Sequence, residues 1–351
     1  MNFFNRLFGA TSRIIGRKQF VSKEPSNLEL IKIKNPILFI HLPKTAGTSF
    51  RKAAERYFGE FKTCKDYGHD SEETSEIVQQ WMIKSCDQWH FKKAFEMENY
   101  QFISGHFIAS RYSQIFGANN SVTFLRDPLQ RIVSEYQHFS RYHNYKKEFK
   151  EFYKTKQFIN KQIKMLHGVP WPALGFIGIT EYYAVSLDLF NKQFDVDFLQ
   201  FEENLSKENI AQRHAIHPDQ ESEIRELNSE DIRLYEQACR QFEWRAKLAE
   251  ENKAFTRGMI GGFNNKRLNG WAVYDEGDEP AKVEVAVNGK SAGCVVACDA
   301  RPQLQALGIR RGGFVGFSLE ICSLSQGDEV TAIVTKTGQP LANSPWRYPG
   351  S

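Results

Sequence analysis

Several features of common protein classes are missing from this sequence of 351 residues. No run of apolar residues reaches the roughly 18 that a membrane-spanning helix needs. No unbroken apolar stretch of the kind found in secretion signals follows Met1. We therefore expect a soluble protein that stays in the compartment that made it, most simply the cytoplasm of a bacterium.

The sequence also lacks a strong excess of one charge and any pattern of paired cysteines. The net charge of +4 argues against a general nucleic-acid binder, which needs concentrated basic stripes, but it leaves room for a local anion site. The six cysteines form no CxxC pair and have no neighbouring histidine cluster. We expect reduced thiols, no disulfide scaffold and no metal.

Glycine is distributed unevenly along the chain. Of the 24 glycines, 14 lie between Gly258 and Gly350. The earlier part alternates short apolar runs with amphipathic stretches, which is typical of an α/β domain, whereas residues 281–287 and 330–334 alternate with period two. Asn288-Gly289 is a typical hairpin turn. We predict an amphipathic segment over 1–30, an α/β domain over 31–254 and a small antiparallel β-sandwich over 255–351.

The first twenty residues carry apolar side chains at helical spacing together with four basic residues. Such a segment is suited to lie on a membrane surface, and it is equally suited to pack on its own domain or to fray. Peripheral membrane contact through residues 1–20 is therefore one of two open alternatives.

The strongest local signal is a buried strand over 37–40 that leads through a tight turn into a helix. The turn reads Pro43-Lys44-Thr45-Ala46-Gly47-Thr48-Ser49. A glycine that allows close backbone approach, a helix N-terminus, a lysine and three hydroxyl groups are all suited to a phosphate or sulfate. The turn is not a Walker P-loop, because Lys44 precedes Gly47 instead of following it. The alternative is an ordinary turn with a surface lysine.

A second strand, over 121–125, ends at Arg126-Asp127-Pro128 and leads into another helix. Asp127 suits the helix cap and Pro128 the first helical turn. Arg126 and Ser134 are then placed to hold a second anionic group. Taken alone, the three residues at this turn would indicate only a salt-bridged helix cap. They indicate an anion site only in combination with the first turn.

These two turns resemble those of sulfotransferases. Residues 43–49 are similar to the loop that binds the 5′-phosphosulfate, and Arg126-Asp127-Pro128 with Arg131, Ser134 and Tyr136 is similar to the 3′-phosphate motif. The His-Leu-Pro-Lys-Thr-Ala-Gly-Thr form resembles the carbohydrate branch that includes heparan and uronyl 2-O-sulfotransferases. The resemblance extends over about residues 35–250. It implies a P-loop-like parallel sheet flanked by helices and sulfuryl transfer from PAPS (3′-phosphoadenosine 5′-phosphosulfate, leaving PAP) to a carbohydrate hydroxyl.

The resemblance also implies roles for individual residues. Lys44, Thr45, Ala46, Gly47, Thr48 and Ser49 would hold the 5′-phosphosulfate, with Lys44 balancing charge on the bridging oxygen, while Arg126 and Ser134 would hold the 3′-phosphate. Transfer needs a base for the acceptor hydroxyl, and histidine is best poised near neutral pH. His106, expected just past a strand, is the first candidate and His41 the second. The alternative for His106 is a structural role.

Further residues are expected to have supporting roles. Glu181 resembles a residue with a structural role or one near the adenine, and Gln162 resembles one that faces the acceptor. The aromatic and basic residues from 136 to 153 suit either sugar stacking or an aromatic core with solvated lysines. Two rival functions stay open: an atypical nucleotide-dependent kinase, and a carbohydrate-binding or scaffold protein with an inactive transferase fold.

Overall fold

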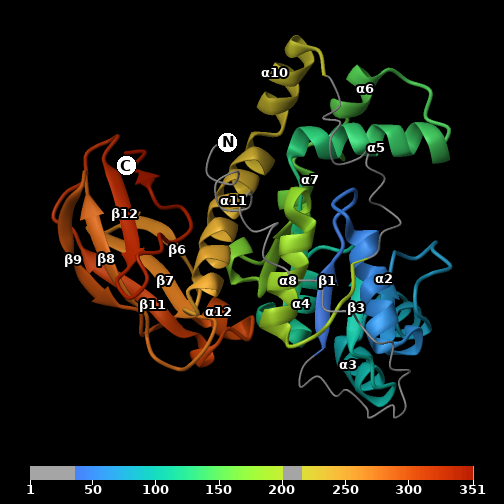
Figure 1. The fold of residues 1–351 in the computed structure, drawn as a ribbon, viewed down its shortest axis with the longest axis horizontal. Coiled ribbons are helices and arrows are strands. Elements are labelled where there is room, and N and C mark those ends of the chain that lie inside the picture. Colours follow the sequence, from blue (N-terminus) through green and yellow to red (C-terminus); the bar gives the residue numbers. More distant parts are fainter. Residues whose placement is uncertain (1–35, 201–215, 351) are drawn as a thin grey trace, which may run out of the picture. The chain divides into compact units, whose positions relative to one another are not determined.

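The computed structural model describes residues 36–200 and 216–350 (Figure 1). The amphipathic segment predicted over 1–30 lies outside the described residues. Residues 33–351 form one compact unit. Within the described ranges no helix combines the length and the apolar character that crossing a membrane requires.

The first part of the described chain is built on a five-stranded parallel sheet. Its strands are β1 (Ile37–Ile40), β2 (Thr63–Asp66), β3 (Phe102–Gly105), β4 (Ser121–Leu125) and β5 (Phe176–Ile179), in the order β2-β3-β1-β4-β5. The unbroken apolar run of β1 is fully buried, as expected for the central strand of a parallel sheet. The chain places β2 and β3 on one side of β1 and then β4 and β5 on the other. Open α/β sheets bind ligands at the carboxyl ends of the strands where the strand order reverses in this way.

Helices flank this sheet. They are α2 (Gly47–Phe58), α3 (Gln88–Met97), α4 (Ser110–Phe116), α5 (Pro128–Tyr142), α6 (Phe149–Tyr153), α7 (Lys161–Met165), α8 (Tyr183–Phe194), α10 (Pro218–Leu227) and α11 (Ser229–Glu250). Phe50 of α2 and Phe190 of α8 pack with Phe39 of β1 in one core cluster. The predicted α/β fold class is confirmed.

The second part consists of two antiparallel sheets. One has the order β10-β11-β7-β6 and the other β13-β12-β8-β9. Their strands are β6 (Thr256–Asn264), β7 (Arg267–Tyr274), β8 (Lys282–Val287), β9 (Lys290–Val296), β10 (Asp299–Ala300), β11 (Phe314–Glu320), β12 (Glu329–Val334) and β13 (Trp346–Arg347), and one short helix, α12 (Pro302–Ala306), lies between β10 and β11. Inward-facing residues of both sheets share one core, including Val283, Val285 and Phe317. The predicted β-sandwich is therefore present, and its Asn288-Gly289 turn has positive φ at both residues, as a two-residue hairpin requires.

Candidate active site

The carboxyl ends of β1, β3 and β4 meet at one cleft. Residues Ile40 and Gly105 are paired in register, so the residues that follow them, His41 and His106, emerge side by side with ring centroids 4.7 Å apart. Arg126 follows the neighbouring strand β4. All three line a cleft of about 1410 Å³, together with residues of the first turn and of α5.

The first turn has an unusual backbone that opens the start of α2. Lys44 and Ala46 have φ values of +67° and +63°, in the left-handed region. Ala46 is the N-cap of α2 and offers no side-chain acceptor, so the first amide groups of this helix have no cap from that residue. Uncapped amides at the positive end of a helix dipole favour an anion.

Gly47 is required at this turn by the closeness of a histidine ring. A Cβ at this position would lie 2.0 Å from Cδ2 of His41, a distance that excludes any side chain without movement of the ring. His41 is in turn fixed by a 3.0 Å hydrogen bond between its Nδ1 and the Tyr67 hydroxyl. The glycine thus allows the start of α2 to pack directly on the buried imidazole.

The two turns are joined through their basic residues. Arg126 donates from Nη1 to the carbonyl oxygen of Lys44, at 3.1 Å. Burial lowers the pKa of both side chains, and the positive charge of Arg126 lowers the pKa of Lys44 further. An anion bound between these cations would relieve both effects.

The second turn is held by the cap of α5 and by Glu181. Asp127 caps α5 by accepting from the amides of Leu129 and Gln130, each at 3.0 Å, and Pro128 is the first residue of the helix, as predicted. The Asp127 amide donates to Oε1 of Glu181 at 2.9 Å. Glu181 therefore supports the second turn, and partial loss of water around its carboxyl group raises the pKa of that group.

Gln162 does not face an acceptor, contrary to the prediction. Its side chain is fully buried and pairs with both backbone groups of Arg126: Oε1 accepts from the amide at 3.0 Å and Nε2 donates to the carbonyl at 2.9 Å. Asp231 of α11 fixes the start of α7 by accepting from the Gln162 amide at 3.0 Å. Gln162 positions Arg126, and no local pattern in the sequence indicates this pairing over 36 residues.

The geometry of His106 defines its tautomer. Nδ1 lies 2.7 Å from the carbonyl oxygen of His41, which can only accept, so Nδ1 carries the hydrogen. Nε2 of the neutral ring is then a free acceptor on a side chain exposed in the cleft. Partial loss of water around the ring, caused by the cleft walls, is the largest cause that lowers the pKa of His106, while the bond to His41 raises it. His41 is itself buried, and burial holds its pKa well below the usual 6.5.

The remaining predicted residues occupy different positions. Thr48, Ser49 and Ser134 line the cleft with Lys44, Ala46 and Gly47. Thr45 is fully buried and its hydroxyl donates to the carbonyl of Leu42 at 2.9 Å, so this hydroxyl shapes the turn and is not directed at a ligand. Only its backbone amide is left for an anion.

A buried carboxylate in the cleft wall was not foreseen from the sequence. Glu135 is 1% exposed and accepts from Arg131 and, at 2.5 Å, from Nζ of Lys161. Lys161 reaches the cleft from α7, beside His106, whose pKa its charge lowers. The i,i+4 spacing of Arg131 and Glu135 was visible in the sequence, but the partner on α7 was not.

The aromatic residues from 136 to 153 are mainly core. Phe152 and Tyr153 are buried, and Tyr136, Tyr145 and Phe149 pack against the same cluster. Phe139 also packs there, and it contributes to the cleft wall as well. Of the two alternatives for this stretch, the structural one is correct for most of its members.

Comparison with known proteins agrees with the resemblance at the level of the family. Residues 30–169, which include both turns and His106, match the model of the sulfotransferase family. No curated protein matches the chain. Among solved structures, a sulfotransferase from Alicyclobacillus acidocaldarius is 14% identical with a TM-score of 0.32, and the match covers 57% of this chain and 93% of that one.

Proposed function

We propose that this protein transfers the sulfuryl group of PAPS to a hydroxyl group of a carbohydrate acceptor. The observation that carries the proposal is the meeting of Lys44, Arg126 and His106 in one cleft at the carboxyl ends of three neighbouring strands. Two cations and a base are the groups that this chemistry needs. The match of residues 30–169 to the sulfotransferase family supports the same reaction.

The donor lies between the two turns in this proposal. Its 5′-phosphosulfate binds the amides at the start of α2, with Lys44, Thr48 and Ser49 around it. Its 3′-phosphate binds Arg126 and Ser134. The N-terminus of α2, whose N-cap residue Ala46 supplies no side-chain acceptor, and the lowered pKa values of the two cations support this arrangement, because both features favour a bound anion.

The chemical step is an in-line displacement at sulfur. The acceptor oxygen forms a bond to sulfur while the bond from sulfur to the bridging oxygen of the donor breaks, and PAP leaves with the negative charge. Lys44 stabilises that charge, and Nε2 of His106 accepts the proton of the acceptor hydroxyl. Positioning and electrostatic stabilisation supply most of the catalysis, as in phosphoryl transfer.

A carbohydrate acceptor is supported by the residues of the first turn and by the size of the cleft. The turn resembles the carbohydrate branch, as described above. The cleft volume of about 1410 Å³ exceeds the roughly 300–1,000 Å³ of sites for a single small ligand, which supports a cleft that holds an acceptor beside the donor. We propose a polysaccharide, oligosaccharide or glycolipid precursor as acceptor, in a cytoplasmic protein. Membrane contact through residues 1–20 stays a prediction.

The test is transfer of radiolabelled sulfate from PAPS to a panel of glycans, followed by product separation. Wild-type protein should label at least one glycan, and Lys44→Ala should not. Lys290→Ala, in the exposed hairpin of β9, is the matched control and should keep full activity. Transfer of the γ-phosphoryl group of ATP to a glycan, with ADP as the leaving product, would favour the kinase, and donor binding without any labelled product would favour the inactive scaffold.

A further inference from the structure

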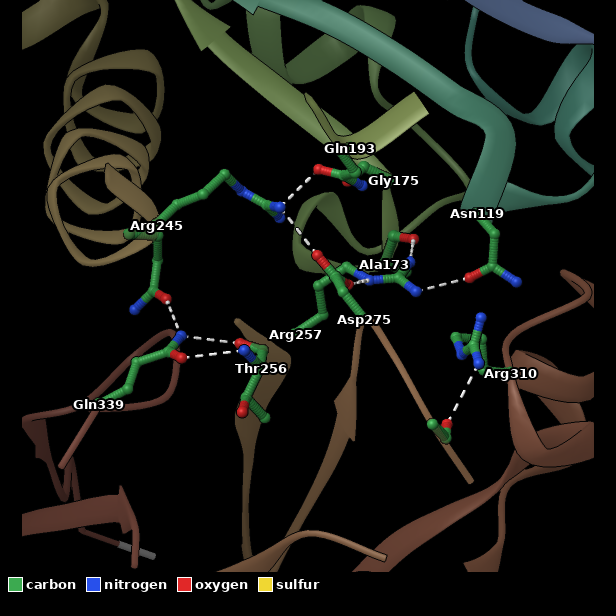
Figure 2. A network of polar contacts seen from close by, with 12 residues as sticks. Asn119, Ala173, Gly175, Gln193, Arg245, Thr256, Arg257, Asp275, Arg310 and Gln339 are labelled. Atoms are coloured by element: carbon green, nitrogen blue, oxygen red, sulfur yellow. Dashed lines mark hydrogen bonds and ion pairs between the residues drawn. The ribbon is translucent and has the colours of Figure 1, made fainter. Parts of the chain in front are cut away.

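The C-terminal sheets join the α/β part through a buried network of charged and amide side chains (Figure 2). At its centre, the Asp275 carboxylate accepts from two arginines, Nε of Arg257 at 2.6 Å and Nη1 of Arg245 at 2.8 Å. Arg257 belongs to β6 and Arg245 to α11. Arg257 is 4% exposed, so the hydrogen bonds of its guanidinium group are shielded from water.

Arg257 reaches two loops of the parallel sheet. Its Nη1 donates to the carbonyl of Ala173 at 2.8 Å, and its Nη2 donates to Oδ1 of Asn119 at 2.6 Å (Figure 2). Asn119 lies in the 3-10 helix that precedes β4, and Ala173 in the one that precedes β5. One guanidinium group from the C-terminal part therefore contacts the entrances of two adjacent strands.

The two loops are also packed tightly on each other. The amide of Gly175 donates to the carbonyl of Ala118 at 2.8 Å, and a Cβ at Gly175 would lie 1.9 Å from the carbonyl oxygen of Asn119. Gln193 donates to the Gly175 carbonyl at 2.9 Å and accepts from Arg245 at 2.5 Å. Movement of either loop would break several of these contacts.

A second connection fixes α11. Gln339 is fully buried, pairs with both backbone groups of Thr256 and donates to Oε1 of Gln241 on α11, at 2.9 Å (Figure 2). The same helix carries Asp231, which holds the start of α7, and Tyr235, which lines the cleft.

The opposite ends of these elements form the second turn of the cleft. β4 leads to Arg126, β5 leads to Glu181, and the Asp127 amide donates to Glu181 at 2.9 Å. The pairing of β4 with β5 extends from Val122 and Phe176 to Leu125 and Ile179. β4 is paired with β1 on one side and with β5 on the other, and each of the four residues of the edge strand β5 is paired with β4, so the two strands connect the two ends.

We propose that the C-terminal sheets act as a clamp on β4, β5 and α11, and that Arg257 is a positioning residue for the half of the cleft that contains Arg126. The C-terminal sheets are then a fixed part of the structure that supports the cleft, and not a separate domain on a linker that binds the carbohydrate acceptor. The effect on donor affinity rests on the proposed function, because it assumes that Arg126 contacts the donor.

The experiment uses the full chain and two readouts, calorimetric unfolding and titration with PAP. We expect wild-type protein to unfold in one cooperative transition. We expect Arg257→Ala and the milder Asn119→Ala to bind PAP about tenfold more weakly at a temperature where both are folded, within the range for coupling through packed elements. Val285→Ala, in the core of the C-terminal sheets, is the control for lost stability alone and should bind like wild type.

The outcomes separate the clamp from the proposed function. Wild-type affinity for PAP in both Arg257→Ala and Asn119→Ala would overturn the positioning role. If wild-type protein binds no PAP, the proposed function fails and unfolding decides about the clamp. Two separate unfolding transitions of the wild-type protein would overturn the clamp. A single wild-type unfolding transition that becomes two transitions in Arg257→Ala would support the clamp.

Discussion

His106 donates its Nδ1 hydrogen to the backbone carbonyl oxygen of His41, at 2.7 Å. The bond fixes the tautomer, because a carbonyl oxygen can only accept. It also fixes the direction of the ring, since β1 and β3 are paired in register up to Ile40 and Gly105. The free electron pair of Nε2 is therefore available in the cleft before any substrate arrives.

Replacement of this imidazole should abolish transfer and leave donor binding intact. We expect His106→Ala to lower the transfer rate by about 10²–10⁴-fold, the usual contribution of a general base. PAP affinity should stay within a factor of about three, because the donor contacts proposed here do not include His106. His69→Ala, at an exposed histidine outside the cleft, is the control. Full activity of His106→Ala would remove this residue from the mechanism.

The pH dependence of transfer should have an acid limb below the usual histidine pKa. Partial loss of water around the ring lowers the pKa of His106 from its ordinary 6.5, and the nearby charge of Lys161 lowers it further. The neutral ring is the active form, so kcat/KM falls as the pH falls through this lowered pKa. Lys161→Met removes a positive charge beside the ring and should move the limb to higher pH. A limb that stays in place, or moves to lower pH, would contradict the assignment.

A methyl group at Gly47 should disturb the donor site. The Cβ of Gly47→Ala would lie 2.0 Å from the His41 ring, so either the ring or the start of α2 must move. We expect a loss of about 1–3 kcal/mol in the free energy of unfolding, as for other overpacked sites, and weaker PAP binding. In the control Gly261→Ala, the nearest atom to the new Cβ is 3.4 Å away, and a small effect is expected. Equal effects in both variants would argue against the close contact.

Gln162 should matter for stability and for donor affinity together. Gln162→Leu leaves the amide and the carbonyl of Arg126 without the partners they have in the native protein. Each unsatisfied buried group costs about 1–3 kcal/mol, which thermal or denaturant unfolding will detect. PAP binding should weaken as the Arg126 backbone shifts. Gln303→Leu, on the exposed side of α12, is the control and should change neither quantity. Unaltered PAP affinity in Gln162→Leu would show that the contact of Gln162 with the Arg126 backbone is dispensable.

Local sequence patterns were sufficient for the elements that begin and end at the two turns. The apolar run of β1, the glycine at residue 47 and the Asp127-Pro128 cap each act over a few residues, so each is visible in a short window. The placement of His106 just past β3 followed in the same way. The period-two runs and the Asn288-Gly289 turn likewise indicated the C-terminal sheets.

Contacts between distant segments could not be predicted in this way. Gln162 was assigned to the acceptor by resemblance, and its actual partner, Arg126, lies 36 residues away, where no local pattern indicates the contact. Arg257 and Asn119 are 138 residues apart, and nothing in either local sequence specifies the other. The role of the Thr45 hydroxyl depended on the left-handed backbone at Lys44 and Ala46, a conformation that non-glycine residues rarely adopt.

The most direct test of the donor site is calorimetric titration with PAP, beside ATP and 5′-AMP, for wild-type protein, Arg126→Ala and the exposed control Arg240→Ala. The account predicts selective binding of PAP that Arg240→Ala keeps and Arg126→Ala loses, because Arg126 donates to the Lys44 carbonyl and is the residue proposed to hold the 3′-phosphate. Absence of PAP binding in the wild-type protein, or tighter binding of ATP with magnesium, would contradict it.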